Sequence, residues 1–152
     1  MTIQTIHFGR LEIEDEETIL FPQGLPGFEE CRRFVPLHRA EVPGLVFLQS
    51  LEQPGLCFVA VVVRPLWPEY ELWLSGEDRE VLGLDGEGEG DLADDVVALA
   101  VLSFTEGEPP TANLLAPVAI CWGTRRALQA VRRDERYSLR EPLPAMEEAS
   151  CS

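Results

Sequence analysis

Lysine is absent from this 152-residue sequence. All 12 of its basic residues are arginine, against 27 Asp and Glu, so the formal net charge at pH 7 is −15. Nucleic-acid binding draws most of its affinity from cationic contacts to phosphates, so this imbalance argues against nucleic acid as a direct ligand. Anionic membrane surfaces are disfavoured for the same reason, whereas a basic protein partner is favoured.

Long hydrophobic runs are also absent. The two longest apolar stretches, residues 56–63 and 96–102, fall far short of the ~20 residues of a membrane-spanning helix. The N-terminal region is acidic and has neither a cationic segment nor an apolar core, so no signal peptide is predicted. We therefore expect a cytoplasmic protein whose four cysteines are reduced thiols: Cys31, Cys57, Cys121 and Cys151.

Groups for catalysis and metal binding are scarce. The two histidines, His7 and His38, lie far apart along the chain, and no cysteine pair has the spacing of zinc ligands. No Ser or Cys stands in the turn context of an activated nucleophile. We expect no catalytic residues, no metal and no other cofactor, and hence a protein that is not an enzyme.

An acidic stretch at residues 85–91 alternates Asp or Glu with Gly and imitates a calcium-binding loop. The position that should hold a bidentate Glu is Val96, so the match fails. We interpret the stretch as a solvated acidic loop, with weak binding of a divalent cation as the alternative. The same acids would repel pyrophosphate, which argues against a dinucleotide cradle.

Short extended segments separated by glycine and proline dominate the pattern. Apolar residues alternate on both sides of Gly9, which predicts a hairpin that includes Ile6 and Phe8. Residues 56–63 are apolar on both faces and predict a central, fully buried strand. Further strands are expected at residues 18–21, 34–37, 45–51, 70–74, 96–104 and 113–122. The pattern is typical of a mainly β protein, a small antiparallel β-barrel or sandwich.

One or two short helices complete the prediction. Ser75 suits the N-cap of a helix that ends at Gly83, and residues 28–32 are expected to form a single helical turn. Residues 1–143 are predicted to be one domain. Residues 144–152, rich in Ala, Glu and Ser, are expected to be a disordered tail.

Half of the arginines stand near the C-terminus. One hypothesis is an RNA-binding module built from them. We favour pairing with the protein's own carboxylates, because Tyr137 is the one aromatic residue beside them in sequence and base stacking needs such rings. The six are Arg125, Arg126, Arg132, Arg133, Arg136 and Arg140.

Several motifs resemble the bacterial flagellar assembly factor FliW family. They are Phe21-Pro22-Gln23-Gly24-Leu25-Pro26-Gly27-Phe28-Glu29, Leu48-Gln49-Ser50, Thr111-Ala112-Asn113-Leu114-Leu115-Ala116-Pro117 and Tyr137-Ser138-Leu139-Arg140. The resemblance covers about residues 3–143. The loop at 85–91 and the tail with Cys151 depart from the family pattern.

The resemblance implies a compact β-barrel-like domain in which residues 125–133 form a strand around Gln129, although their composition favours helix. It also implies a function. Proteins of this family bind the small basic RNA-binding repressor CsrA, stop it from repressing flagellin mRNA, and bind flagellin itself in a chaperone-like way. Secretion of flagellin then frees the factor to act on CsrA, so the mechanism is an exchange of partners.

The candidate contacts to a basic partner are six acids in the segment 77–95: Glu77, Asp78, Asp85, Glu87, Asp94 and Asp95. The motif residues are expected to serve the architecture: Phe21, Pro22, Gly24, Leu25, Pro26, Gly27, Phe28, Asn113, Leu114 and Pro117.

Phe28 and Leu25 are expected to plug one end of the barrel, and Asn113 to bond backbone at a strand start. On that interpretation Phe28→Ala would cost about 3–5 kcal/mol of stability and both partners would be lost together with folding.

Overall fold

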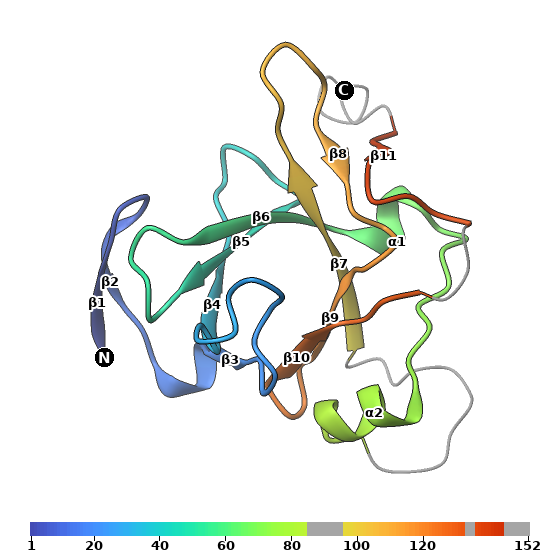
Figure 1. The fold of residues 1–152 in the computed structure, drawn as a ribbon. Helices are drawn as coiled ribbons and strands as arrows, with labels where there is room; N and C mark the ends of the chain where they lie inside the picture. Colours follow the sequence, from blue (N-terminus) through green and yellow to red (C-terminus); the bar gives the residue numbers. More distant parts are fainter. Residues whose placement is uncertain (85–95, 133–135, 145–152) are drawn as a thin grey trace.

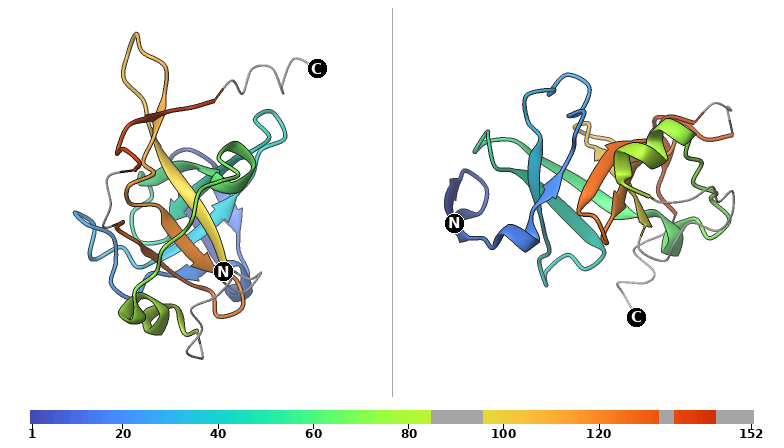
Figure 2. Two further views of the ribbon diagram at one scale, coloured as in Figure 1. Left: turned by 90° about the vertical axis from the view of Figure 1, so that its right-hand side faces the viewer. Right: turned by 90° about the horizontal axis from the view of Figure 1, so that it is seen from below.

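The N-terminal segment forms a hairpin beside the main body of the molecule. The computed structural model describes residues 1–84, 96–132 and 136–144 (Figure 1). Strands β1 (Thr2–Thr5) and β2 (Gly9–Glu12) pair antiparallel, which confirms the predicted hairpin. Ile6 and Phe8 lie in its turn rather than in a strand, because the Thr5 hydroxyl donates to the Gly9 carbonyl and accepts from the Phe8 N–H and so closes the turn. Figure 2 shows the hairpin standing to one side.

Seven strands of the described residues close into a barrel. Their order around it is β7-β6-β5-β4-β3-β10-β9, and a pairing of β7 with β9 completes the circle. All neighbours are antiparallel except β3 and β10. The predicted mainly β, barrel-like fold is confirmed. The strands are β3 (Ile19–Leu20), β4 (Arg33–Leu37), β5 (Leu45–Ser50), β6 (Cys57–Val62), β7 (Val96–Ser103), β9 (Val118–Cys121) and β10 (Arg126–Gln129).

The far end of β7 carries a small extension of the sheet. Its residues Leu102 and Ser103 pair with β8 (Thr111–Ala112), which pairs in turn with β11 (Glu141–Pro142). The loop between β7 and β8 projects away from the barrel (Figure 1).

Three short helical segments are present in the described residues: a 3-10 turn η1 (Asp15–Glu17), α1 (Val63–Leu66) and α2 (Gly76–Leu82). The predicted helix after Ser75 is confirmed. The Ser75 hydroxyl accepts from the Asp78 N–H, and the Asp78 carboxylate accepts from the Ser75 N–H. Gly83 ends α2 with φ +75°. Leu82 packs on the outer face of β9 and β10.

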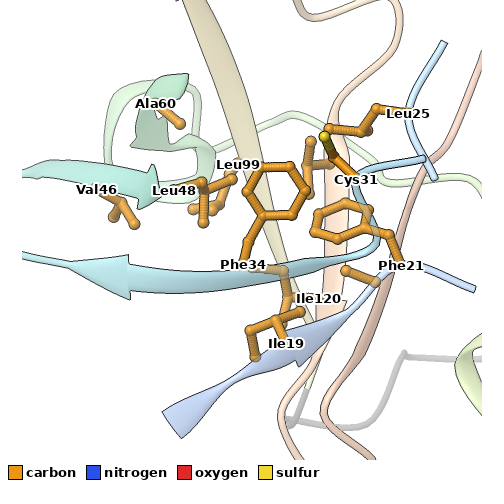
Figure 3. Close-up of a cluster of buried hydrophobic side chains, with 12 residues drawn as sticks. Ile19, Phe21, Leu25, Cys31, Phe34, Val46, Leu48, Ala60, Leu99 and Ile120 are labelled. Carbon is orange, nitrogen blue, oxygen red and sulfur yellow. The ribbon is translucent and has the colours of Figure 1, made fainter. Parts of the chain in front are cut away.

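The barrel is filled by aromatic and aliphatic side chains from most of its strands. Phe21 and Phe34 are fully buried, and their rings meet edge to face with centroids 5.2 Å apart. Figure 3 shows them converging with Ile19, Leu48 and Ile120. A second cluster includes Val63 of α1 with Val61 and Leu114, and a third joins Leu82 of α2 to side chains of β9 and β10.

Four expectations about local structure were wrong. Residues 28–32 form no helical turn, because Phe28 bridges back to Leu25 and a turn follows at residues 29–30. Residues 70–74 form no strand, and residues 113–117 are irregular. Residues 70–74 are held by other means: the Glu71 carbonyl accepts from the Arg132 guanidinium, and Leu72 and Leu74 pack on the third cluster. The fourth expectation was a fully buried strand at residues 56–63. Strand β6 is central but not fully buried, since part of its outer face is half-exposed.

No helix in the described part of the chain is long and apolar enough to cross a membrane. The predicted tail falls almost entirely outside the described residues.

Candidate functional site

The Phe21–Phe28 segment is a string of turns at one end of the barrel. Phe21 lies in the core, and its backbone N–H donates to the Arg32 carbonyl at 2.7 Å. Gly24 has φ +69°, and a Cβ placed on it would lie 2.7 Å from the Glu29 Cα and carbonyl oxygen. Only glycine fits this close crossing of two backbone segments without strain.

Leu25 and Phe28 face each other across the turn. Leu25 is 6% exposed, and its carbonyl accepts from the Phe28 N–H at 2.7 Å. Phe28 is only half-buried, with its ring edge-to-face on Phe58 at 5.6 Å. The plug of this end is therefore Phe21 with Leu25, and the expectation that Phe28 is a buried plug was too strong. Pro22 is half-buried, whereas Pro26 and Gly27 are exposed.

The Asn113–Pro117 segment links β8 to β9. The Asn113 carboxamide oxygen accepts from the Ala116 N–H at 2.9 Å. Leu114 is fully buried, and its carbonyl accepts from the Tyr70 hydroxyl at 2.7 Å. Pro117 is buried, and its carbonyl accepts from the Ala130 N–H. The segment thus bonds to two distant parts of the chain, at Tyr70 and Ala130, through its backbone carbonyls.

Of the predicted acidic contacts, the structure places Glu77 and Asp78. Both lie in the first turn of α2, where Glu77 is exposed and the Asp78 carboxylate is engaged in the helix cap. The remaining four, Asp85, Glu87, Asp94 and Asp95, lie outside the described residues. A second group of exposed acids begins at the last residue of β2: Glu12, Glu14, Asp15, Glu16 and Glu17.

The C-terminal arginines contact aromatic rings. Arg132 is 7% exposed, with its guanidinium over Tyr70 at 5.0 Å and over Tyr137 at 5.1 Å. The Arg125 guanidinium lies 5.3 Å from the Trp122 ring centroid. The expected carboxylate pairing is absent at Arg125, Arg126 and Arg140 among the described residues. Sequence reasoning missed Tyr70, which lies far along the chain.

A shallow hollow of about 290 Å³ lies between the hairpin turn and the outer face of β5 and β6. His7 and Cys57 both line it, but the His7 Nε2 lies 3.3 Å from the Gly55 carbonyl, and burial raises the pKa of the Cys57 thiol. A raised pKa keeps the thiol protonated, which is the opposite of what a nucleophile needs. The hollow is also lined by Phe8, Arg39, Phe47 and Val59. The described part of the chain holds no cluster of three or more metal-ligating side chains.

Comparisons with known proteins agree on one family. The family model described as FliW protein matches residues 2–143. Flagellar assembly factor FliW of Syntrophotalea carbinolica is 36% identical over 95% of this chain and 98% of its own length. That of Bacillus subtilis is 34% identical over 94% of this chain and 96% of its own length.

A solved structure described as the crystal structure of the flagellar assembly factor FliW superposes with a TM-score of 0.81. It is 31% identical in sequence and covers 97% of this chain and 99% of its own. Sequence and fold therefore match along nearly the whole length, and this chain belongs to the FliW family of flagellar assembly factors.

Proposed function

We propose that this chain is a non-enzymatic cytoplasmic regulator that binds the translational repressor CsrA, relieves repression of flagellin mRNA, and also binds flagellin. Membership of the FliW family is the observation that carries the proposal. The net charge of −15 supports it, since an acidic protein attracts a basic repressor and disfavours the RNA that the repressor binds.

Two exposed acidic surfaces are available for the basic partner. One is the first turn of α2, where Glu77 has no part in the helix cap. The other is the stretch after β2, where Asp15 and Glu16 are exposed. Asp78 and Ser75 exchange the hydrogen bonds that cap α2, so we assign Asp78 a structural role. The acids 85, 87, 94 and 95 remain predicted contacts of the same partner.

A mobility-shift assay on flagellin leader RNA tests the proposal. Addition of the chain to a preformed CsrA–RNA complex should release free RNA without shifting that RNA itself. Direct binding of the RNA by this chain at physiological salt would instead favour the RNA-binding alternative. The structure weighs against that alternative, because Arg132 is buried and Arg125 already covers a face of Trp122.

Charge variants make the assay specific. Changing Glu16 and Glu77 to Gln should weaken release of the RNA because it removes carboxylates from the two acidic surfaces. Changing Glu106 and Glu108 to Gln removes the same charge from the exposed loop between β7 and β8 and serves as the control. Equal effects of the two pairs would mean that net charge alone, and no particular surface, attracts the repressor.

A further inference from the structure

Three residues of neighbouring strands stand in a row on the outer face of the barrel. Leu20 of β3 pairs with Arg33 of β4 on one side and with Arg126 of β10 on the other. Residues directly opposite one another project from the same face of a sheet. A chain neighbour of each residue is buried in the core: Ile19 before Leu20, Phe34 after Arg33 and Ala127 after Arg126. The row therefore faces outward.

The row is open to solvent. Arg33 and Arg126 are exposed, and Leu20 keeps 38% of its surface accessible. Two more exposed arginines adjoin it in sequence: Arg32, next to Arg33, and Arg125, whose guanidinium lies over Trp122. We call Leu20 and these four arginines the arginine row. It gathers a third of the chain's cations around one exposed aliphatic side chain.

Within residues 1–84, 96–132 and 136–144, no carboxylate forms a salt bridge with an arginine of the row. Among the described residues the salt bridges join Arg10 to Glu12 and Arg39 to Glu41, and neither involves the row. The Glu52 carboxylate accepts from the Arg33 backbone N–H at 3.2 Å, and no salt bridge to the Arg33 guanidinium is formed by the described carboxylates. Arg33 and Arg126 flank Leu20, and Arg32 and Arg125 precede them in sequence, so four exposed arginines of a chain with 27 acids lie on or beside neighbouring strands. The Arg126 guanidinium extends toward Gly83 at the end of α2. Positive charge of this kind attracts carboxylates.

We propose that the arginine row is a docking surface for an acidic polypeptide segment of a partner protein. Guanidinium groups bind carboxylates in a planar, two-pronged geometry, so Asp or Glu side chains of the segment would contact Arg33 and Arg126. Leu20 between them would pack against an aliphatic residue of the same segment. The row is opposite in charge to the acidic surfaces assigned to CsrA, so this inference goes beyond the proposed function and does not depend on it.

A peptide fits the row better than RNA does. Charges interact over about 8 Å at physiological salt, so a short acidic segment is governed by the row and its immediate surroundings. A phosphate polymer would extend beyond the row over a surface that is acidic overall. Single-stranded RNA also needs aromatic faces for its bases, and Arg125 already lies over Trp122.

The test is a titration of this chain against a fluorescent synthetic heptapeptide of Glu and Asp with one central Leu. The double variant Arg33→Gln, Arg126→Gln should bind it about tenfold more weakly than wild type, which corresponds to about 1.4 kcal/mol. Leu20→Ser should weaken binding about threefold through loss of an apolar contact. The side chains are exposed, so melting temperatures should stay near that of wild type.

The matched control is Arg10→Gln, Arg140→Gln, which removes two exposed arginines outside the row. It should bind the peptide nearly as well as wild type. Equal weakening by both pairs, or no binding of the peptide by wild type up to about 1 mM, would overturn the proposal. Preferential binding of a single-stranded RNA probe that the row variants abolish would overturn it too, and assign the surface to nucleic acid.

Discussion

The rings of Tyr70 and Tyr137 lie with centroids 4.7 Å apart, and the guanidinium of Arg132 stacks on both. The same guanidinium donates to the Glu71 carbonyl, and the Tyr70 hydroxyl donates to the Leu114 carbonyl. This arrangement joins the segment after α1, the link between β8 and β9, and the segment before β11. The buried cation thus connects the stretches around Tyr70 and Tyr137, and the Tyr70 hydroxyl connects them to the link between β8 and β9.

Replacement of Arg132 should therefore destabilise the fold. Two cation–π contacts and a charged hydrogen bond predict a loss of about 2–4 kcal/mol in the free energy of unfolding for Arg132→Ala. Arg132→Lys should lose about half as much, because ammonium keeps the charge without the planar stacking surface. Urea denaturation measures both. Arg140→Ala, at an exposed position, is the control, and an equal loss there would contradict the explanation.

Glycines in the Phe21–Phe28 segment offer a matched pair. Gly24 and Gly27 both have positive φ, but only at Gly24 would a Cβ meet backbone, at 2.7 Å from Glu29. Gly27→Ala should cost about 1–2 kcal/mol for the left-handed conformation alone. Gly24→Ala should cost about 2–3 kcal/mol more, because the backbone at Glu29 must move. If the melting temperature falls equally in the two variants, the close crossing at Gly24 does not contribute to stability.

A Phe28→Ala variant tests whether Phe28 supports the fold or contacts a partner. Because it is half-buried, Phe28→Ala should cost about 1–3 kcal/mol, less than the 3–5 kcal/mol of a core aromatic. Phe21→Ala, at a fully buried site, should show the larger loss of about 3–5 kcal/mol. Affinities for CsrA and flagellin are measured beside the melting temperature. A stable Phe28→Ala variant that loses one partner alone would make Phe28 a recognition residue.

The sequence predicted those parts of the fold whose signals are local. Ser75 and Gly83 mark the ends of α2 because capping depends on neighbouring residues. The β10 strand around Gln129 was predicted from the family resemblance against its own helix propensity, and its pairing with β3 and β9 explains why it is extended. Tertiary pairing outweighed propensity there.

Contacts between distant segments could not be predicted in the same way. Residues 70–74 have the composition of a strand, yet Arg132 bonds the Glu71 carbonyl, and Leu72 and Leu74 pack on the cluster around Leu82 of α2. The arginine row depends on the register of β3 with β4 and β10, and no spacing in the sequence reveals that register. Surface clusters made from several strands become visible only with the topology.

Cys57 should respond to alkali through its raised pKa. The folded state holds the thiol proton more tightly than the unfolded state does. The contribution of the protonated thiol to the free energy of unfolding is therefore complete below the pKa of the unfolded state. It is lost as pH rises through the pKa of the folded state. Unfolding free energies of wild type and Cys57→Ala, measured from about pH 7 to pH 10, should therefore converge at the alkaline end. A constant difference would contradict the role of burial. Iodoacetamide should also modify Cys57 more slowly in the folded protein than in urea.

Association with CsrA should depend strongly on salt. Exposed acids such as Asp15, Glu16 and Glu77 create a negative field that accelerates encounter with a basic partner, and salt screens that field. The Debye length shrinks from about 14 Å to about 4 Å between ~0.05 and ~0.5 M salt, so the association rate should fall several-fold while the dissociation rate changes little. Stopped-flow mixing measures both rates. The Glu16→Gln, Glu77→Gln variant should start from a lower rate and show a shallower dependence than wild type. A flat profile for wild type would mean that the acidic surface serves solubility alone and that short-range contacts determine recognition of the repressor.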